Sequence, residues 1–298
     1  MLSQQLWHTS PTKTEIRSVE IEQDNDLLLC KGLYSLISIG TENLVASGKV
    51  PFQMFESMRV PYMQGDFGLP VNYGYSMIAS VQHPENDSSK LAHVMHPHCN
   101  SFYAKSGDLF YLDEDTNLVA ATFIANMETA INAIWDSQVQ VGDKVLICGY
   151  GVIGALIAEI LNSMPGIQVT ILELNDARKQ IAFQKSFNTE LESDYDVCFN
   201  CTAHEDALQI CIDHSAYESK IIELSWYGIK AVNVNIGMDF HIKRKQIISS
   251  QVSHIPSFKS ARWDYKRRKA LAYHFTQTLD LAFLQKHIIP FKESPSTF

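Results

Sequence analysis

The stretch that decides the fold reads Val145-Leu-Ile-Cys-Gly149-Tyr-Gly151-Val-Ile-Gly154. Its first four residues are apolar and predict a short buried strand, and the residues that follow Gly154 have the apolar spacing of a helix. A Gly-x-Gly-x-x-Gly turn between a strand and a helix predicts a Rossmann unit that binds a dinucleotide. Gly149 allows the tight turn, Gly151 lets a diphosphate approach the backbone, and Gly154 lets the helix pack closely on the strand. The diphosphate would lie at the helix N-terminus, beside Val152 and Ile153.

An acidic residue ends the next predicted strand, residues 169–173, which read Val-Thr-Ile-Leu-Glu. Glu173 follows the last glycine by about 20 residues, the spacing at which a carboxylate accepts hydrogen bonds from the adenosine ribose. A carboxylate repels a 2′-phosphate, and the next residue is Leu174 instead of an arginine. The pattern therefore favours NAD over NADP, with Arg178 keeping NADP as the alternative.

The second half of the chain alternates between strand and helix patterns. Predicted helices cover residues 126–135, 153–163, 177–187, 207–212 and 270–284, and predicted strands cover residues 144–148, 169–173, 197–200, 220–224 and 247–252. This alternation predicts an α/β fold with a parallel, doubly wound sheet. We expect a Rossmann domain over residues 121–285.

The first part of the chain has a different sequence pattern. Short β-branched or aromatic runs, such as residues 27–30 and 34–39, are separated by Gly, Pro and Asn. They predict a β-rich domain over residues 1–120. Residues 286–298 read as an extended segment that leaves the Rossmann domain.

Composition limits the class of partner. The chain has 298 residues, 46% of them hydrophobic, and a formal net charge of −9, which argues against nucleic-acid binding because that draws on clustered Lys and Arg. We expect a small-molecule substrate, and we interpret the basic run at residues 262–269 as a solvated helix face. The apolar run at residues 145–162 contains three glycines and Glu159, so no membrane span is predicted. Six scattered cysteines and the lack of a signal-peptide pattern predict a cytoplasmic protein.

Several longer stretches resemble the medium-chain dehydrogenases and reductases of the zinc-type alcohol dehydrogenase superfamily. They are LYSLISIGTENLVASGKVP (33–51), GDFGLPVNYGY (65–75), NMETAINAIWD (126–136), IIELSWYG (221–228) and SSQVSHIPSFKSARWDYKRRKALA (249–272). They look most like the branch that includes bacteriochlorophyllide dehydrogenases. The resemblance implies a GroES-like catalytic domain, completed by residues 286–298, beside the Rossmann domain. It also implies a homodimer and a bulky substrate. Members of the family continue past the position of Phe298 with a further strand and helix.

The resemblance also shows where a catalytic zinc would be expected. The run that matches the first ligand, Cys-Gly-Thr-Asp in the family, is Ile39-Gly40-Thr41-Glu42, and the run that matches the second, Gly-His-Glu, is Gly74-Tyr75-Ser76. Glu128 matches a further carboxylate that some members place at the metal. Because a catalytic zinc needs about three protein ligands, no zinc is expected. The four-cysteine structural lobe is not expected either, since only Cys99 lies between His83 and Asp113.

A replacement metal site could be built on His96-Pro-His98-Cys99, because residues two apart on a strand share a face. Two such groups do not complete a site, and a structural role or a role of His98 in catalysis stays as the alternative. Cys198 and Cys201 have redox spacing, but along a predicted strand, so we expect buried packing.

Chemistry without a metal still needs a group that carries the substrate proton. Thr41 matches the family's proton-relay hydroxyl, Tyr75 would place a phenol near the substrate oxygen, and Glu42 and Glu128 could polarise Tyr75 or position a water. Each has a structural alternative: Thr41 could cap a turn, Glu128 could cap the helix that follows Asn126, and Tyr75 could fill the space that zinc occupies in the family. On the nicotinamide side we expect residues that follow predicted strands at their carboxyl ends, namely Cys201, Thr202, Ser225 and Trp226.

The function predicted from these features is an NAD(P)(H)-dependent oxidoreductase that interconverts an alcohol and a carbonyl without zinc. Two alternatives stay open: a zinc-independent reductase of enones or quinones, and a dinucleotide-binding sensor or accessory protein without catalysis.

Overall fold

The computed structural model describes residues 1–24, 26–82, 89–285 and 287–298. The chain divides into two compact units: unit 1 holds Met1–Ala125 with Gln285–Phe298, and unit 2 holds Asn126–Leu284. Each unit is described by itself. Lys286, which begins the predicted returning segment, and residues 83–88, which begin the region compared with the structural lobe, lie outside the described residues.

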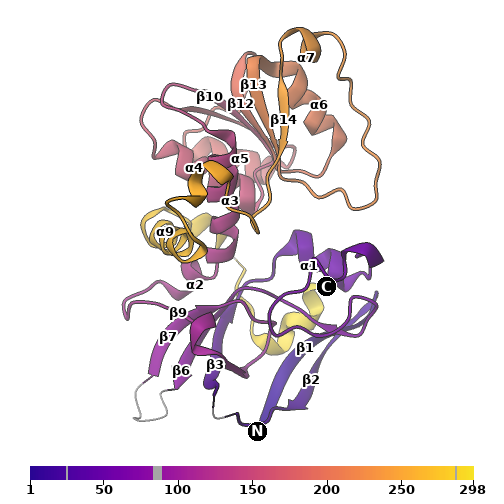
Figure 1. The fold of residues 1–298 in the computed structure, drawn as a ribbon, viewed down its shortest axis with the longest axis vertical. Helices are drawn as coiled ribbons and strands as arrows, with labels where there is room; N and C mark the ends of the chain where they lie inside the picture. The colour runs from indigo at the N-terminus through magenta and orange to yellow at the C-terminus, as the bar shows by residue number, and fades with distance from the viewer. Residues whose placement is uncertain (25, 83–88, 286) are drawn as a thin grey trace. The chain divides into compact units, whose positions relative to one another are not determined.

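Unit 2 is built on a five-stranded parallel sheet in the order β11-β10-β12-β13-β14 (Figure 1). Its strands are β10 (Lys144–Cys148), β11 (Gln168–Leu172), β12 (Tyr195–Asn200), β13 (Ser215–Glu223) and β14 (Gln246–Ser249). Its helices are α3 (Ile124–Ser137), α4 (Val152–Asn162), α5 (Asp176–Gln184), α6 (Glu205–His214), α7 (Asp239–Ile242), α8 (Ser257–Ser260), α9 (Tyr265–Thr278) and the 3-10 helix η3 (Ala282–Leu284).

Helices cover both faces of this sheet. Leu146 and Cys148 pack in one apolar cluster with Leu208 and Ile212 of α6. Ile147 points to the opposite face, because side chains alternate along a strand, and α4 packs there: a Cβ on Gly154 would lie 3.3 Å from Ile147 Cγ2. The sheet is thus doubly wound, which confirms the predicted fold class.

The last long helix begins and ends earlier than its apolar spacing predicts. The prediction places it at residues 270–284, whereas α9 covers Tyr265–Thr278. Asp264 caps it, accepting a hydrogen bond from Arg267 N at 2.7 Å, and a capping carboxylate fixes a helix start more strongly than apolar spacing does. Residues 265–269 of the basic run therefore lie inside the helix, and Arg268 is buried rather than solvated.

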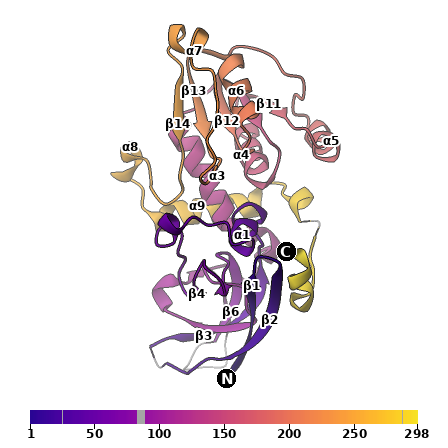
Figure 2. The same cartoon turned by 90° about the vertical axis from the view of Figure 1, so that its right-hand side faces the viewer.

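Unit 1 consists of two antiparallel sheets, one in the order β2-β1-β5-β4 and one in the order β8-β3-β6-β7-β9. Figure 2 shows β1 and β2 of the first sheet and β3 and β6 of the second. Their strands are β1 (Leu2–Ser10), β2 (Lys13–Glu20), β3 (Leu28–Ser35), β4 (Gln64–Gly65), β5 (Val71–Asn72), β6 (Met77–Gln82), β7 (Ser89–Val94), β8 (Ser101–Ala104) and β9 (Phe110–Tyr111). The unit also holds α1 (Ile39–Ala46), α2 (Leu118–Ala121) and the 3-10 helices η1 (Phe52–Met54), η2 (Ser106–Asp108) and η4 (Phe291–Thr297).

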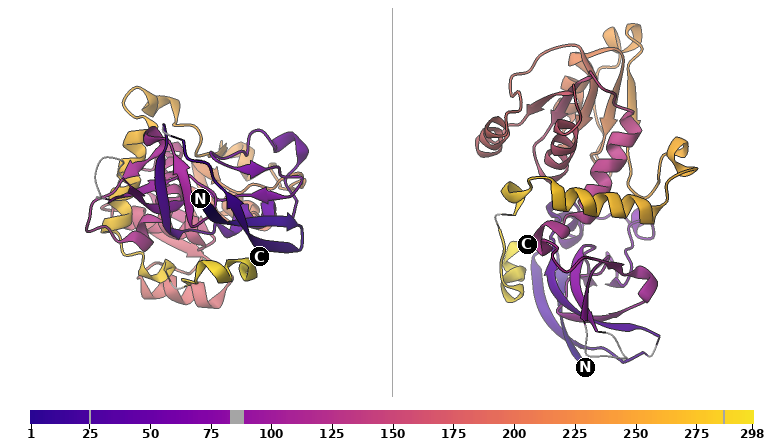
Figure 3. Two further views of the ribbon diagram at one scale, coloured as in Figure 1. Left: turned by 90° about the horizontal axis from the view of Figure 1, so that it is seen from below. Right: turned by 90° about the vertical axis from the view of Figure 1, so that its left-hand side faces the viewer.

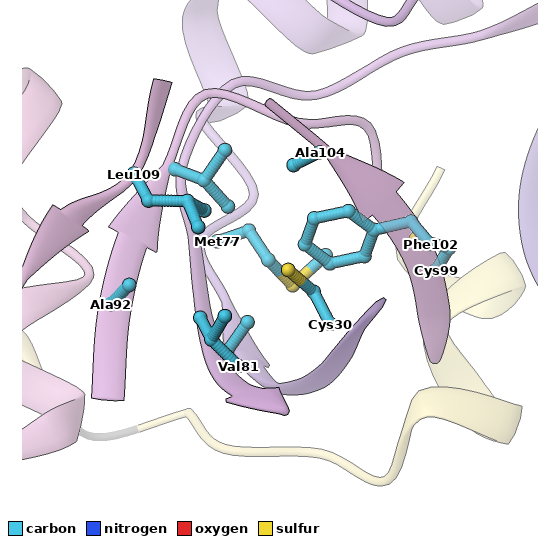
Figure 4. Close-up of a cluster of buried hydrophobic side chains, with 10 residues drawn as sticks. Cys30, Met77, Val81, Ala92, Cys99, Phe102, Ala104 and Leu109 are labelled. Atoms are coloured by element: carbon cyan, nitrogen blue, oxygen red, sulfur yellow. The ribbon is translucent and has the colours of Figure 1, made fainter. Parts of the chain in front are cut away.

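The core packed on the five-stranded sheet of unit 1 is small and rich in sulfur. Cys30, Met77 and Phe102 point toward one another there, flanked by aliphatic residues of β6 and β7 (Figure 4). Cys30 and Met77 are almost fully buried, so this face of the sheet is closed to water.

Two details of unit 1 differ from the sequence prediction. The run at residues 34–39 is not one strand: β3 ends at Ser35 and α1 begins at Ile39, which places Thr41 and Glu42 on a helix. The C-terminal segment ends as η4 instead of an extended strand, and it packs against β2 (Figure 3). Helical propensity is low in this segment, so tertiary contact decides its shape.

Within the described parts of the chain, helices are too short or too polar to cross a membrane.

Candidate active site

The polar cluster of unit 1 forms around a buried carboxylate. Glu42 lies on α1 and is fully buried. One of its oxygens, Oε1, accepts a hydrogen bond from Ser38 N, the residue before the helix, at 2.8 Å. The other, Oε2, lies 2.7 Å from Nε2 of His98. The helix start thus holds the carboxylate in one orientation toward the imidazole.

His98 continues this chain of hydrogen bonds. Its Nδ1 lies 2.9 Å from the hydroxyl of Ser35, at the end of β3. If Nε2 donates to the Glu42 carboxylate, Nδ1 is the acceptor for the Ser35 hydroxyl. Gly74 makes room for the ring: its φ is 134°, and a Cβ there would lie 2.8 Å from His98 Nε2. The series Ser35, His98, Glu42 is a hydroxyl, an imidazole and a carboxylate in contact.

Tyr75 lies at the edge of the same cluster and is half-buried. Burial, followed by the negative charge of Glu42, raises the pKa of Tyr75 to about 12, against hydrogen bonds with the side chains of Ser38 and Thr41. The phenol therefore keeps its proton at neutral pH. Four residues predicted as catalytic, Thr41, Glu42, Tyr75 and His98, lie together in unit 1.

His8 belongs to the same region and was not predicted. It is fully buried on β1, its Nδ1 lies 2.9 Å from Thr14 Oγ1, and its Nε2 has no hydrogen-bond partner among the described residues. Burial lowers the pKa of His8 to about 4, with Glu42 raising and His98 lowering it. The alternation along β1, in which His8 shares the inward face with Leu6, was the signal that could have identified it.

The donor set of this cluster does not fit a zinc ion. Ile39 has no lone pair and is exposed, Tyr75 holds its proton, and Glu42 and His98 are engaged with each other. Among the residues that the structure describes, no group of three or more His, Cys, Asp or Glu side chains could hold a metal.

His96 and His98 do not share a strand face, because β7 ends at Val94 before either is reached. His96 stacks on Phe102 at 3.9 Å between ring centroids and contacts Cys99. Burial lowers the pKa of His96 to about 4. The two histidines therefore lie in different surroundings, His96 in the sulfur-rich core and His98 in the polar cluster.

In unit 2 the glycine turn has the local geometry that a dinucleotide needs. Gly149 has φ 93°, in the left-handed region that favours glycine, and a Cβ on Gly154 would lie only 1.9 Å from Gly149 O. A Cβ on Gly151 would meet no atom within 4 Å, so packing does not require glycine there. Gly151 precedes α4, whose first residues Val152 and Ile153 are half-buried. These residues fit a diphosphate at the helix N-terminus.

Glu173 follows β11 directly and holds the turn in place. Its Oε2 accepts a hydrogen bond from Tyr150 N and its Oε1 one from Asn175 N, both at 2.8 Å. Arg178 lies 3.8 Å from the same carboxylate. Leu174, the next residue, is 94% exposed, so its side chain is free for contact with a ligand and makes little contact with the protein.

Beyond the turn, the loops after β12 and β13 bring together the other predicted cofactor residues. Thr202 packs over Gly149, since a Cβ there would lie 2.8 Å from Thr202 Cγ2. Ser225 accepts a hydrogen bond from Ala203 N at 2.8 Å, while Cys201 is half-buried and Trp226 is exposed. Sequence reasoning missed Asn200 and Glu223, which connect these loops. Their position at the ends of β12 and β13 was the available signal.

Glu128 belongs to unit 2 and has a partner there. Its Oε1 accepts a hydrogen bond from Arg268 Nε at 3.1 Å, and Arg268 also donates to Asn132 at 2.8 Å. Burial raises the pKa of Glu128, against the opposing charges of Lys269 and Arg268. This arrangement gives Glu128 a structural partner 140 residues away in sequence, and its predicted role beside Tyr75 stays a prediction.

No protein-family model and no curated protein matches the chain. Solved structures do match its fold. A protein described as a zinc-binding dehydrogenase from Sinorhizobium meliloti 1021, bound to NADP, is 14% identical, with a TM-score of 0.76 over 100% of this chain and 95% of that one. Benzyl alcohol dehydrogenase from Acinetobacter calcoaceticus is 12% identical, with a TM-score of 0.75 over 100% and 95%. An alcohol dehydrogenase from E. coli CFT073 in complex with NADH is 11% identical, with a TM-score of 0.69 over 92% and 87%.

These matches establish the fold, which is that of the medium-chain, zinc-type dehydrogenases.

Proposed function

We propose that this chain is an NAD(P)(H)-dependent oxidoreductase that interconverts an alcohol and a carbonyl, with Tyr75 as the proton-transfer group and no catalytic zinc. The observation that carries the proposal is the glycine turn, where Gly149 and Gly154 are required by the backbone and Gly151 is open. A glycine that no protein atom crowds, at a helix N-terminus, is explained if a ligand approaches the backbone there.

A nicotinamide dinucleotide held at the glycine turn would supply or accept the hydride. The residues of unit 1 would then handle the proton. The Tyr75 phenol is protonated at neutral pH and would donate a hydrogen bond to a carbonyl oxygen, stabilising the negative charge that develops there. The hydroxyls of Ser38 and Thr41 contact this phenol and would return a proton to it.

Glu42 and His98 would act behind Tyr75. Their contact at 2.7 Å fixes the negative charge near the phenol, and this charge helps to keep the proton on Tyr75 until the substrate oxygen demands it. Ser35, His98 and Glu42 are connected in series by hydrogen bonds, so we assign them positioning roles.

NAD is the preferred cofactor in this proposal, because a carboxylate, Glu173, follows β11 directly. Arg178 beside it makes NADP the alternative, and the solved structures with the same fold include one with NADP and one with NADH. The sequence resemblance to the bacteriochlorophyllide dehydrogenase branch adds a bulky substrate to the proposal.

The cofactor half of the proposal is tested by NADH titration of the purified chain, followed by nucleotide fluorescence. Gly151→Ala should weaken NADH binding by about tenfold or more, since the new methyl group occupies the phosphate approach, and it should leave the thermal midpoint unchanged. Gly40→Ala is the matched control, because its Cβ also meets nothing within 4 Å. If Gly151→Ala binds NADH as tightly as the wild type, the assignment of the turn is wrong.

The catalytic half is tested with a panel of alcohols, aldehydes and enones that includes bulky cyclic ketones. Tyr75→Phe should lower kcat by about 100-fold, a usual contribution of general acid catalysis, with NADH affinity unchanged. Tyr73→Phe removes a neighbouring phenol and is the control. Turnover of enones alone would favour the reductase alternative, and NADH binding without any turnover would favour the sensor.

A further inference from the structure

The carboxyl ends of β12 and β13 carry a polar hub that the proposed chemistry does not use. Asn200 and Glu223 are partners in the parallel register of these strands, and Asn200 is fully buried. The Asn200 Nδ2 group donates to Glu223 Oε2 at 2.9 Å and to the Tyr227 hydroxyl at 3.0 Å. The amide thus connects a strand end with the loop that follows its neighbour.

The carbonyl oxygen of the Asn200 side chain holds the loop that follows β12. Asn200 Oδ1 accepts from Thr202 N at 3.2 Å and from Thr202 Oγ1 at 2.8 Å. Glu223 Oε1 accepts from Ser225 N at 2.8 Å. Both loops are therefore fixed through Asn200 and Glu223, and the Glu223 carboxylate is held by backbone and amide donors.

Those donors are neutral. None of the ion pairs between described residues involves Glu223. Its side chain is half-buried, so its charge is partly shielded from water and acts over several ångströms. The result is a fixed, unneutralised negative charge at the carboxyl edge of the sheet.

The topology places this charge on one side of the proposed dinucleotide. The diphosphate belongs to the turn after β10, and the adenosine ribose to Glu173 after β11. Since the two halves of a dinucleotide bind to either side of the central strand, the nicotinamide half belongs to β12 and β13. The oxidised nicotinamide ring carries a positive charge and the reduced ring is neutral.

We propose that Glu223 makes this protein bind the oxidised dinucleotide in preference to the reduced one, by stabilising the cationic nicotinamide. The inference rests on the proposed function and deepens it, because it says which form of the cofactor the site retains. The oxidised cofactor would be retained and the reduced cofactor released more readily. A charge at this depth, in an environment of intermediate dielectric, should change the ratio of the two dissociation constants by about three- to tenfold.

The test compares Glu223→Gln with the wild type, because glutamine keeps the shape and an acceptor for Ser225 N. The Kd of NADH is measured by its fluorescence and the Kd of NAD⁺ by competition with it. We expect the Kd of NAD⁺ to rise three- to tenfold and the Kd of NADH to stay within twofold. Glu192→Gln is the matched control: it removes a carboxylate from the same unit that contacts Lys144, at the start of β10, and should leave the ratio unchanged.

A second pair of variants keeps the test decisive if Glu223→Gln fails to fold. Trp226, exposed in the loop after β13, is replaced by Lys in one variant and by Leu in the other. Only Trp226→Lys should weaken NAD⁺ relative to NADH, since it places a cation near Glu223. An unchanged ratio in Glu223→Gln, or an equal loss of both affinities, would overturn the inference and leave the proposed function standing. A wild-type chain that binds neither nucleotide would overturn both.

Discussion

Burial shifts the pKa of different kinds of side chain in the two units. In unit 1 it lowers the pKa of two imidazoles, His8 and His96, to about 4. In unit 2 it raises the pKa of three carboxyl groups, Glu128, Asp136 and Glu159. In both units burial disfavours the charged form, yet the same cause makes the units respond to acid in opposite ways.

The direction follows from where the protons bind. Below pH 6.5 the unfolded chain protonates His8 and His96 while folded unit 1 does not, so the free energy of unfolding of unit 1 falls as the pH falls toward 4. Above pH 4.5 folded unit 2 retains protons on its raised carboxylates that the unfolded chain has released. Its free energy of unfolding therefore rises as the pH falls toward 4.5.

The largest expected effect is the acid response itself. Between pH 7 and pH 5, unit 1 should lose about 2 kcal/mol for each of the two histidines, since each unit of pKa shift corresponds to about 1.4 kcal/mol. Unit 2 should lose none. Urea series at the two pH values, read by pulsed hydrogen exchange and mass spectrometry, report peptides of each unit separately.

The matched variant is His96→Gln, which keeps a donor for Pro97 O and removes one titrating group. It should halve the pH dependence of unit 1. Equal destabilisation of both units at pH 5 would show that the comparison is wrong.

A smaller effect is expected from removing one partner of the buried pair in unit 1. His98→Ala leaves the Glu42 carboxylate without its imidazole and should cost about 3 kcal/mol at pH 7. The double variant His98→Ala with Glu42→Leu should recover part of that loss, because no buried charge remains. If His98→Ala is as stable as the wild type, the pair does not contribute to the stability of unit 1; peptide-resolved urea unfolding decides between these outcomes.

The smallest effect concerns the corresponding pair in unit 2. Arg268→Met should cost about 2 kcal/mol at pH 8 and clearly less at pH 5. The difference arises because Glu128, whose pKa burial already raises, takes up a proton at the lower pH. Arg267→Met is the control: this exposed side chain lies 4.0 Å over the Trp263 ring, and its loss should cost less than about 1 kcal/mol at either pH. A loss from Arg268→Met that is independent of pH would contradict the assignment of Glu128 as the titrating group.

What could be predicted from the sequence was mainly local. The glycine turn and the apolar strands of the Rossmann unit carry their signal within a few residues, so α4 and β10 lie within a residue or so of their predicted positions. The start of α9 was missed because a single capping residue, Asp264, outweighs the apolar spacing that follows it.

The candidate site depended on contacts between distant residues. Glu42 and His98 are 56 positions apart, and no periodicity connects them. The same applies to Glu128 and Arg268. Thr41 and Tyr75 were identified because a family resemblance points to their positions. His8 and Asn200 match no such motif, and Glu223 lies in the resembling stretch 221–228 but became visible only through the contacts around it.

The buried cysteines offer a practical reporter of how each unit opens. Cys30 and Cys99 lie in unit 1, and Cys148, Cys198 and Cys211 lie in unit 2; all five are buried, and burial raises the pKa of the Cys30 thiol to about 12. An alkylating reagent reacts with the thiolate, so these sites should label only when their unit unfolds. Mass spectrometry of alkylated peptides then times the opening of the two units in one sample of wild-type protein, without engineered labelling sites.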